Sequence, residues 1–494
     1  MLASPIAHAH FRLGGGWRQN LLVVGAYTAL VVLLTTLALR TSSDQDRPEV
    51  SAACLSIVAI VQAVFAILIA PGAVRRAVLR DFQTGMIESH RPTPLSGLNM
   101  VYGYLTGPTA QSFMLFTAGL IIGGYLAGIY GVSLGFPSLM LASWYASQLC
   151  LAALAFMVIA VALLTALATA GKTNLMVLII IFGVFGGWFL IPFVPGLTLL
   201  MGVMSAGLVL EAIGQKSLVA GSEAVLGWAM LLQIAMAIVL IAASCRKARA
   251  PDKPVFSIPL SLALLAVTGL ALVLGWRHYG EFSRVIDWDQ SSIAQWVGSG
   301  VTFALTGLFA LSAAAYRRHQ LDRVRLLTSG RPPATFHGFD SMPILITAAT
   351  ALILACTLPP AVHRDLHTAP LAVAAPVLAA WLMSFWVDFT VISIALARGR
   401  GVFRLILLSW GMFKALPLLI EGVLAFVAEM LGDDHATEWT IAGLSPIGTL
   451  IQVSLRHNPW IGVAAQAAIA IGVTLLGIQI RRNLRVTHSS KLPT

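Results

Sequence analysis

Long apolar runs alternate with short polar segments from one end of the chain to the other. About 18–20 apolar residues form a helix long enough to cross the ~30 Å hydrocarbon core of a bilayer. A helix also pairs its own backbone groups where no water is present. The pattern therefore predicts an all-α polytopic, multi-pass membrane protein with about twelve transmembrane helices. The predicted spans are 20–39, 51–71, 99–127, 138–169, 174–194, 222–244, 255–276, 294–316, 342–359, 370–393, 403–428 and 460–480.

Basic residues are distributed unequally between the two sides of these spans. If the N-terminus is cytoplasmic, 23 of the 31 Lys and Arg residues fall in inner segments, seven fall in outer segments, and Lys414 lies within a span. Cytoplasmic loops of membrane proteins carry such an excess. We therefore predict that both termini are cytoplasmic and that the protein lies in the cell (inner) membrane. The net charge of +11 then faces the anionic inner leaflet of the lipid bilayer and requires no nucleic-acid partner.

The polar segments between the predicted spans are too short to hold a soluble domain. The longest have about 25 to 30 residues, whereas a soluble domain needs roughly 100. The segment ALATAGKT, 166–173, ends like a phosphate-binding loop. However, Ala166 stands at the position of the first glycine, and a span precedes the segment where a strand is required. We therefore predict no catalytic or nucleotide-binding site, no cofactor and no enzyme activity in this chain.

Metal-binding residue types occur in one outer loop, HRDLH at residues 363–367. Such spacing is common by chance in polar loops, so we predict no metal site. The cysteines lie in or at the ends of spans and form no C-x-x-C pair, which is typical of small core residues. They are Cys54, Cys150, Cys245 and Cys356.

The twelve predicted spans divide into two groups of six at the basic, proline-containing linker 245–256. In each group a polar inner loop joins the second and third spans, and an apolar but interrupted outer segment, 195–221 or 429–459, follows the fifth. We expect these outer segments to dip into the membrane and return if protein surrounds them. The likeness predicts a parallel repeat with halves 1–248 and 249–494. The inner loop of the second half is marked by Arg317, Arg318, Arg331 and Pro332.

The inner loop of the first half has a distinctive pattern. Residues 74–88 place apolar side chains four positions apart, which predicts an amphipathic coupling helix along the inner membrane surface. These side chains are Val74, Val78, Phe82 and Met86. Arg91 precedes a proline and should end the helix, and Thr93 is then expected to cap a new helix with Pro94 at its first position. The result is a helix–break–helix elbow at 75–98, at the cytoplasmic mouth of the third span.

The elbow sequence GMIESHRPTPLSGLNMVYG, 85–103, resembles a segment of ABC-exporter permeases of the second type. That family's pattern runs approximately Gly-Thr-Leu-Glu, four apolar residues, Thr-Pro-Leu-Ser, and later Gly-Lys. The matching residues are Gly85, Glu88, Thr93, Pro94, Leu95, Ser96 and Gly103. The chain departs from the pattern because Tyr104 replaces the lysine and polar residues replace the four apolar ones; these are Ser89, His90, Arg91 and Pro92.

The resemblance implies a permease subunit of an ATP-driven exporter, in a duplicated twelve-span form. A separate nucleotide-binding ATPase subunit would push on the elbow, and the two halves would together line one pathway for an exported substrate. The sequence does not name that substrate. Six spans with a broken outer segment before the sixth are also this family's plan, and the segment LSPIGTL, from Leu444, is similar to its outer segment.

Two opposite charges are predicted at similar depth in neighbouring spans. Asp388 lies ten residues before Arg398 at the inner end of the tenth span, and Lys414 lies ten residues after Arg404 in the eleventh. Spans joined by so short a loop are antiparallel neighbours. Because an isolated charge near a helix centre costs roughly 2.5–3.5 kcal/mol on insertion scales, we predict that the two pair. Glu421 is expected either to be a second partner of Lys414 or to face the pathway.

These charges keep a second class of function open. An ion-coupled secondary transporter would use Asp388, Lys414 and Glu421 for coupling. A membrane-embedded enzyme would need converging catalytic residues, and a sensor or scaffold would transport nothing.

Overall fold

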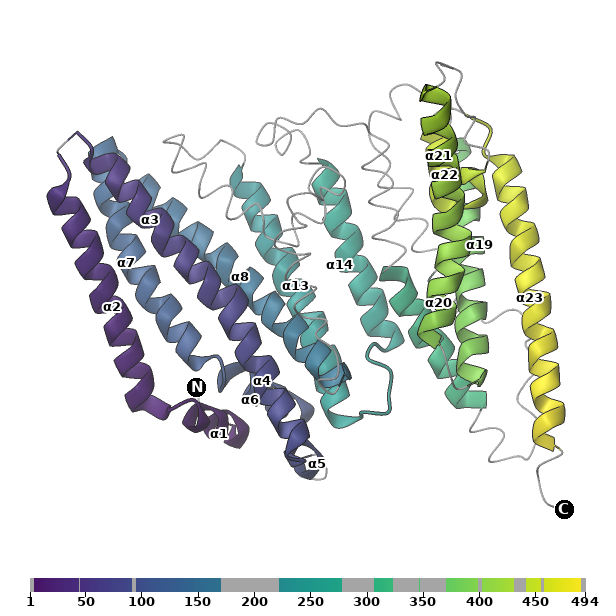
Figure 1. Cartoon of the computed structure of the whole chain (residues 1–494), viewed down its shortest axis with the longest axis horizontal. Coiled ribbons are helices and arrows are strands. Elements are labelled where there is room, and N and C mark those ends of the chain that lie inside the picture. Colours follow the sequence, from purple (N-terminus) through teal and green to yellow (C-terminus); the bar gives the residue numbers. More distant parts are fainter. Residues whose placement is uncertain are drawn as a thin grey trace. The chain divides into compact units, whose positions relative to one another are not determined.

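The fold is described from a computed structural model of the chain, in which the described residues form helices joined by turns (Figure 1). No strand occurs in this part of the chain. The described residues up to Val255 belong to one compact unit, unit 1, and the described residues from Phe256 onward belong to a second, unit 2. The described residues are 4–43, 45–90, 95–169, 222–277, 306–322, 346, 370–398, 402–430, 441–454 and 457–489.

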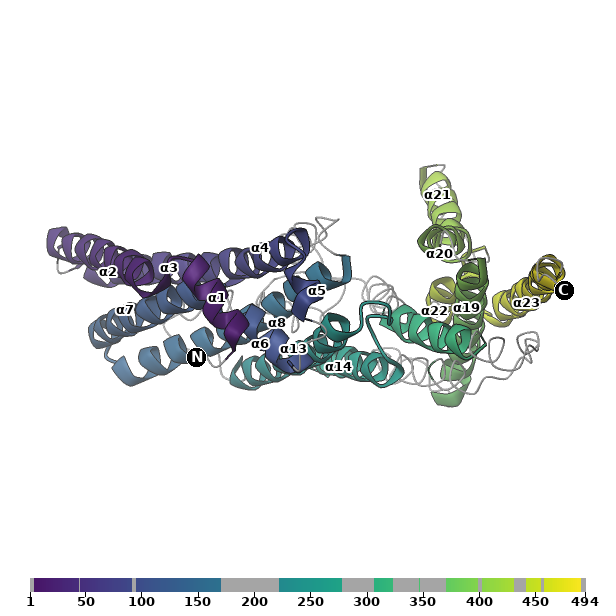
Figure 2. The same ribbon diagram turned by 90° about the horizontal axis from the view of Figure 1, so that it is seen from below.

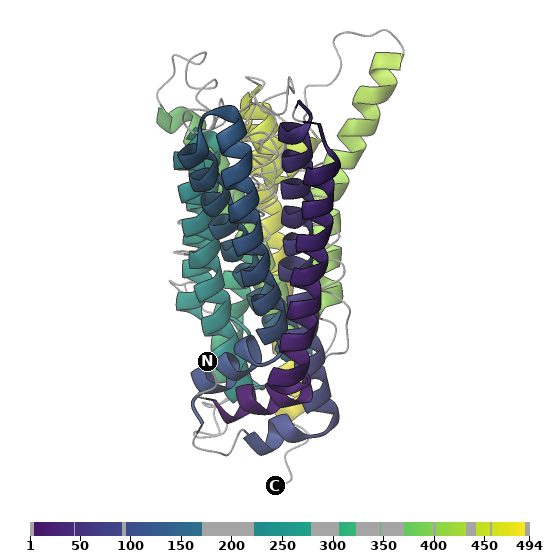
Figure 3. The ribbon, with the colours of Figure 1, turned by 90° about the vertical axis from the view of Figure 1, so that its left-hand side faces the viewer.

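Unit 1 is a bundle of long helices with short helices gathered at one end (Figures 1 and 3). Within the bundle, α8 packs against both α7 and α13, and α3 packs against α7. The elements are α1 (Pro5–Leu13), α2 (Gly16–Thr41), α3 (Arg47–Ala63), η1 (Val64–Ile69), α4 (Ala70–Gln83), α5 (Met86–His90), α6 (Gly97–Thr106), α7 (Ala110–Leu134), α8 (Pro137–Thr169) and α13 (Ser222–Arg249).

Unit 2 is built around α19, which packs against α20, α22 and α23. The short helix α22 is buried almost throughout, so protein surrounds it on all sides. The elements are α14 (Ile258–Arg277), α19 (Pro370–Arg398), α20 (Val402–Trp410), η3 (Gly411–Ala415), α21 (Leu416–Met430), η4 (Ala442–Leu444), α22 (Pro446–Ser454) and α23 (Trp460–Ser489). Residues 306–322 are also helical.

Eight helices in the described part of the chain are long and apolar enough to cross a membrane. They are Gly16–Thr41, Arg47–Gln83, Ala110–Leu134, Pro137–Thr169, Gly227–Arg249, Ile258–Gly275, Ala375–Arg398 and Trp460–Ile480. Each overlaps one predicted span. The predicted span 403–428 is covered by α20, η3 and α21, which follow one another without a break. The predicted spans 174–194, 294–316 and 342–359, and the outer segment 195–221, lie wholly or mostly outside the described residues.

The third predicted span, 99–127, is not one helix. It is divided at residues 107–109 into α6 and α7. Pro108 has no backbone N–H and interrupts the helical hydrogen-bond ladder at this point. Gly107 also lets α1 approach closely, because a Cβ atom there would lie 2.6 Å from the carbonyl oxygen of Ala7.

The predicted surface helix over 74–88 is also wrong in its bounds. α3, η1 and α4 form one helix from Arg47 to Gln83, so α4 continues the second span directly. The π-helical turn η1 lies immediately before Pro71, and such turns accommodate irregularities in a helix. The helix ends before Gly85, whose φ of 73° lies in the left-handed region.

Candidate functional site

The elbow of unit 1 consists of α4, α5 and α6, at the end of the bundle where α1 also lies (Figure 2). The left-handed Gly85 turns the chain from α4 into α5. This turn breaks the four-residue pattern: Met86 is 46% exposed, and its neighbour Ile87 is fully buried instead. Glu88 lies on the exposed side of α5. The predicted apolar face therefore holds for Val74 and Val78 but not for Met86.

The second helix of the elbow begins later than predicted. α6 starts at Gly97, and Ser96 is its N-cap, with the hydroxyl accepting a hydrogen bond from the Asn99 N–H at 3.2 Å. Thr93 and Pro94, which were predicted to cap and start this helix, lie outside the described residues, and the described Leu95 and Ser96 are not helical. Ser96 is as suitable an N-cap residue as a threonine, and α6 packs closely against α13 where it begins. A Cβ atom at Gly97 would lie 2.5 Å from the carbonyl oxygen of Cys245 in α13. Residues 91–94 lie outside the described part of the chain.

The N-terminal helix α1 packs along α6, a contact that the sequence reasoning missed. A Cβ atom at Gly103 would lie 2.7 Å from the Ile6 Cβ, so this glycine allows the two helices to touch. The Ser4 hydroxyl donates a hydrogen bond to the Asn99 carbonyl at 3.2 Å. The signal for α1 was present, because Pro5 follows a serine and the apolar Ala7 and Phe11 lie four positions apart on one helical face.

A buried polar cluster joins three elements of this site. The Tyr104 hydroxyl of α6 donates to Asp81 Oδ2 of α4 at 2.6 Å, and His10 Nε2 of α1 lies 3.2 Å from the same oxygen. The His10 and Tyr104 rings are 5.4 Å apart between centroids. Asp81 is 4% exposed and Tyr104 is fully buried. We refer to these three residues as the elbow cluster.

Sequence reasoning did not select the elbow cluster. Asp81 follows Val74 and Val78 on the buried face of α4, and an acidic residue at such a position was the available signal. Tyr104 occupies the position of the lysine in the exporter pattern. The packing around the cluster is apolar and ties the elbow to α8 and the end of α13. Its buried members include Ile6, Val74, Val78, Ile87, Met100, Val101, Ile159, Leu163 and Ala248.

The inner loop of the second half is described only at its start. Arg317 and Arg318 lie within the helical stretch 306–322, where Arg317 is exposed and Arg318 is half-buried. Arg331 and Pro332 lie outside the described residues. Of these four residues, the structure therefore places only Arg317 and Arg318.

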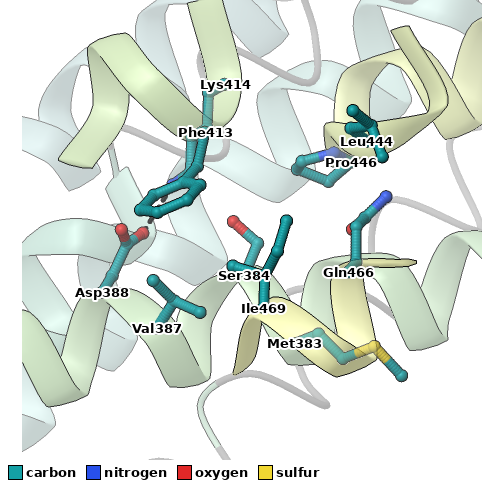
Figure 4. A pocket seen from close by; sticks show the side chains of 10 residues that line it. All are labelled: Met383, Ser384, Val387, Asp388, Phe413, Lys414, Leu444, Pro446, Gln466 and Ile469. Carbon is teal, nitrogen blue, oxygen red and sulfur yellow. Dashed lines mark hydrogen bonds and ion pairs between the residues drawn. The ribbon is translucent and has the colours of Figure 1, made fainter. Parts of the chain in front are cut away.

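The predicted intramembrane ion pair is confirmed in unit 2. Lys414 Nζ, from η3, lies 2.5 Å from Asp388 Oδ2, from α19, and both side chains are at most 5% exposed (Figure 4). The ammonium group also lies 3.9 Å from the centroid of the Trp410 ring. A carboxylate and an aromatic face both stabilise a buried ammonium. The π-helical turn that carries Lys414 is a feature often found at functional sites.

Glu421 makes contacts that the sequence did not predict. Its Oε2 accepts hydrogen bonds from the backbone N–H groups of Ile441 at 3.0 Å and Ala442 at 3.2 Å. These donors begin the short helix η4, whose first N–H groups lack helical partners. Glu421 therefore anchors the segment 441–454 to α21 from one side.

Gln466 of α23 holds the same segment from the other side. Its Nε2 donates to the Gly443 carbonyl at 2.7 Å and to Thr449 Oγ1 at 2.8 Å. Gln466 was not selected from the sequence, where it is one glutamine in an apolar span. The segment 441–454 is therefore fixed by two buried polar side chains from separate helices.

The described helices are those of a multi-pass helical membrane protein. In comparisons with known proteins, no protein-family model, curated protein or solved structure matches the chain. No group of three His, Cys, Asp or Glu residues in the described part of the chain is placed to hold a metal ion. The HRDLH loop lies outside that part.

Proposed function

We propose that the chain is the membrane-spanning permease subunit of an ATP-driven exporter, energised by a separate ATPase subunit that contacts the elbow. The proposal includes twelve spans in two parallel six-helix repeats, cytoplasmic termini and a place in the cell membrane. The observation that supports it is the construction of the elbow. α5 is joined to a 37-residue helix, Arg47–Gln83, so a push on α5 reaches a membrane span directly.

The packing of the elbow suits such a contact. Ile87 is fully buried against the apolar cluster, while Met86, Glu88 and Ser89 on the same short helix are exposed. One face of α5 is thereby fixed to the bundle, and the other offers a carboxylate and a hydroxyl to a partner. The elbow cluster attaches α1 and α6 to α4, so the elements move together.

The proposal predicts that the chain binds no ATP alone and that Glu88 affects a partner's ATPase activity. The experiment purifies the tagged chain from its native membranes, identifies any ATPase that remains bound, and measures hydrolysis with Glu88→Ala. Glu49→Ala is a matched control, because Glu49 is exposed near the start of α3, far along the helix from the elbow. Altered hydrolysis with Glu88→Ala alone supports the proposal. Absence of any bound ATPase, together with normal export by the variant, contradicts it.

An ion-coupled secondary transporter is the second candidate, and the buried Asp388–Lys414 pair is the observation that favours it. Ionisable groups inside a membrane often serve ion coupling. The two candidates differ in their energy source. Transport by the purified chain in liposomes, driven by an ion gradient without ATP, would identify the secondary transporter and exclude the exporter.

A further inference from the structure

A small cavity lies beside the Asp388–Lys414 pair (Figure 4). Its volume is about 20 Å³. On the same measure a water molecule needs roughly 10–15 Å³, so the cavity accommodates one molecule of that size. The walls come from α19, η3, η4, α22 and α23. They consist of Met383, Ser384, Val387, Asp388, Phe413, Lys414, Leu444, Pro446, Gln466 and Ile469.

Gln466 lines this cavity, and one of the two polar atoms of its amide group has no hydrogen-bond partner in the described part of the chain. The Gly443 carbonyl can only accept a hydrogen bond, so the amide nitrogen of Gln466 must face it. The amide oxygen Oε1 is then the atom left over, and it has no hydrogen-bond partner among the described residues. The Gln466 residue is only 5% exposed. A buried acceptor of this kind is costly unless a donor reaches it.

Donors and acceptors meet on the other walls of the cavity. Lys414 Nζ carries three hydrogens, and its hydrogen bond to Asp388 uses one of them. Asp388 and Ser384, whose side chains can both accept a hydrogen bond, belong to the same walls. A molecule in the cavity that donates a hydrogen bond to Gln466 Oε1 and accepts one from the Lys414 ammonium would satisfy both of these groups.

We infer that this cavity is a binding site for one water molecule, which bridges Gln466 Oε1 to the Asp388–Lys414 pair. Water is the smallest neutral molecule that both donates and accepts hydrogen bonds, and the volume fits it. A bound cation would meet the ammonium of Lys414, and a bound anion would meet the carboxylate of Asp388. Both kinds of ion are therefore disfavoured.

The water gives the ion pair a polar contact with the rest of unit 2. It connects α19 and η3 to α23, and through Gln466 to the segment 441–454. The pair is then hydrated on one side, although apolar and aromatic groups surround the rest of it. This site does not depend on an ATPase partner or on transport.

Radiolytic footprinting tests the inference in the full-length protein in lipid nanodiscs. An X-ray pulse produces hydroxyl radicals from water in place, and these oxidise the side chains that touch bound water. We expect Met383 and Phe413, which line the cavity, to be oxidised several-fold faster than two reference methionines. Met100 is fully buried in the apolar core of unit 1, and Met412 is 52% exposed on η3, where we expect lipid to cover it.

Two variants distinguish oxidation caused by water bound in the cavity from oxidation caused by general solvent exposure of Met383 and Phe413. Gln466→Leu removes Oε1 and should lower the oxidation of Met383 and Phe413 to the rate of Met412. Thr449→Val removes a partner of the amide nitrogen but keeps Oε1, and should leave that oxidation unchanged. If Gln466→Leu fails to fold, Ser384→Val, which fills the cavity, should give the same loss. Oxidation of Met383 and Phe413 no faster than that of Met100 and Met412, or unaffected by both cavity variants, would overturn the inference.

Discussion

The phenol of Tyr104 and the carboxylate of Asp81 share a buried hydrogen bond of 2.6 Å, between residues 23 positions apart in the chain. The bond joins α6 to α4, which continues the second predicted span, across the break at Gly85. His10 reaches the same carboxylate oxygen from α1. One side chain of α4 thus holds two other elements of the elbow in place.

Tyr104→Phe should destabilise unit 1. Hydrogen bonds to charged groups contribute roughly 1.5–3 kcal/mol, and Asp81 remains buried after the change. Thermal unfolding in detergent measures the loss. Tyr125→Phe is the control, because Tyr125 is 70% exposed on α7 and should tolerate the change. Equal melting temperatures for the two variants would show that the bond contributes no stability.

Gly103→Ala should loosen α1 without unfolding the bundle. The new Cβ atom would lie 2.7 Å from the Ile6 Cβ, and overpacking of this kind costs roughly 1–3 kcal/mol. Hydrogen exchange should then be faster in residues 5–13 than in the wild type. Gly25→Ala in α2 is a matched control, since nothing lies within 4 Å of a Cβ atom there. Unchanged exchange in α1 would contradict the close packing of α1 on α6.

Changing either member of the Asp388–Lys414 pair alone should reduce the amount of folded protein. Removal of one partner from a buried ion pair costs about 3–5 kcal/mol, because the other charge stays buried. The reversed pair, Asp388→Lys with Lys414→Asp, should restore accumulation in the membrane, measured by immunoblotting and size-exclusion chromatography. Restored transport would indicate a structural pair, and restored accumulation without transport would indicate a relay. Failure of the reversed pair to accumulate would argue against simple charge pairing.

Glu421→Ala should release the segment 441–454 from α21. Two backbone N–H groups would lose a charged acceptor, at a cost of roughly 1–3 kcal/mol for each one that stays buried. Glu421→Gln keeps an acceptor oxygen and should have a smaller effect. Limited proteolysis within 441–454 would measure the release. Equal protection in the wild type and both variants would show that Glu421 does not hold this segment.

Single cysteines at Ser89 and Ser43 should be labelled from opposite sides of the membrane. Both positions are exposed, and one predicted span separates them. The arrangement of basic residues predicts that Ser89 is cytoplasmic and Ser43 is outside. A membrane-impermeant maleimide added to intact cells and to inverted vesicles gives the result. Labelling of both from one side would overturn the predicted orientation of the second span.

Long-range pairing of charges was predictable from the sequence, but local helix ends were less so. Asp388 is the only charged residue in its predicted span, Lys414 is the only charged residue near the middle of the next, and the short connection between the spans fixes their relative depth. Thr93 and Ser96 are both suitable N-caps, and the sequence pattern did not single out Ser96, which caps α6. Met86 follows the apolar pattern of α4, but the turn at Gly85 removes it from that face.

The partners of Glu421 and Gln466 could not be derived from a helical pattern. Both bind backbone groups of the segment 441–454, and backbone groups leave no trace in the order of side chains. The elbow cluster was missed for a similar reason. His10, Asp81 and Tyr104 come together through the packing of three separate helices, and no spacing along the chain expresses that packing.

The uninterrupted helix from Arg47 to Gln83 has a mechanical consequence. Its 37 residues measure about 55 Å at ~1.5 Å per residue, against a hydrocarbon core of ~30 Å. Part of this helix therefore projects from the bilayer and can act as a lever. The helix would pivot where the surrounding lipid and helices hold it. A load applied at the projecting end tilts the opposite end in the reverse direction. The π-turn at Val64–Ile69 is the most compliant point along this rod, so bending under load would concentrate there.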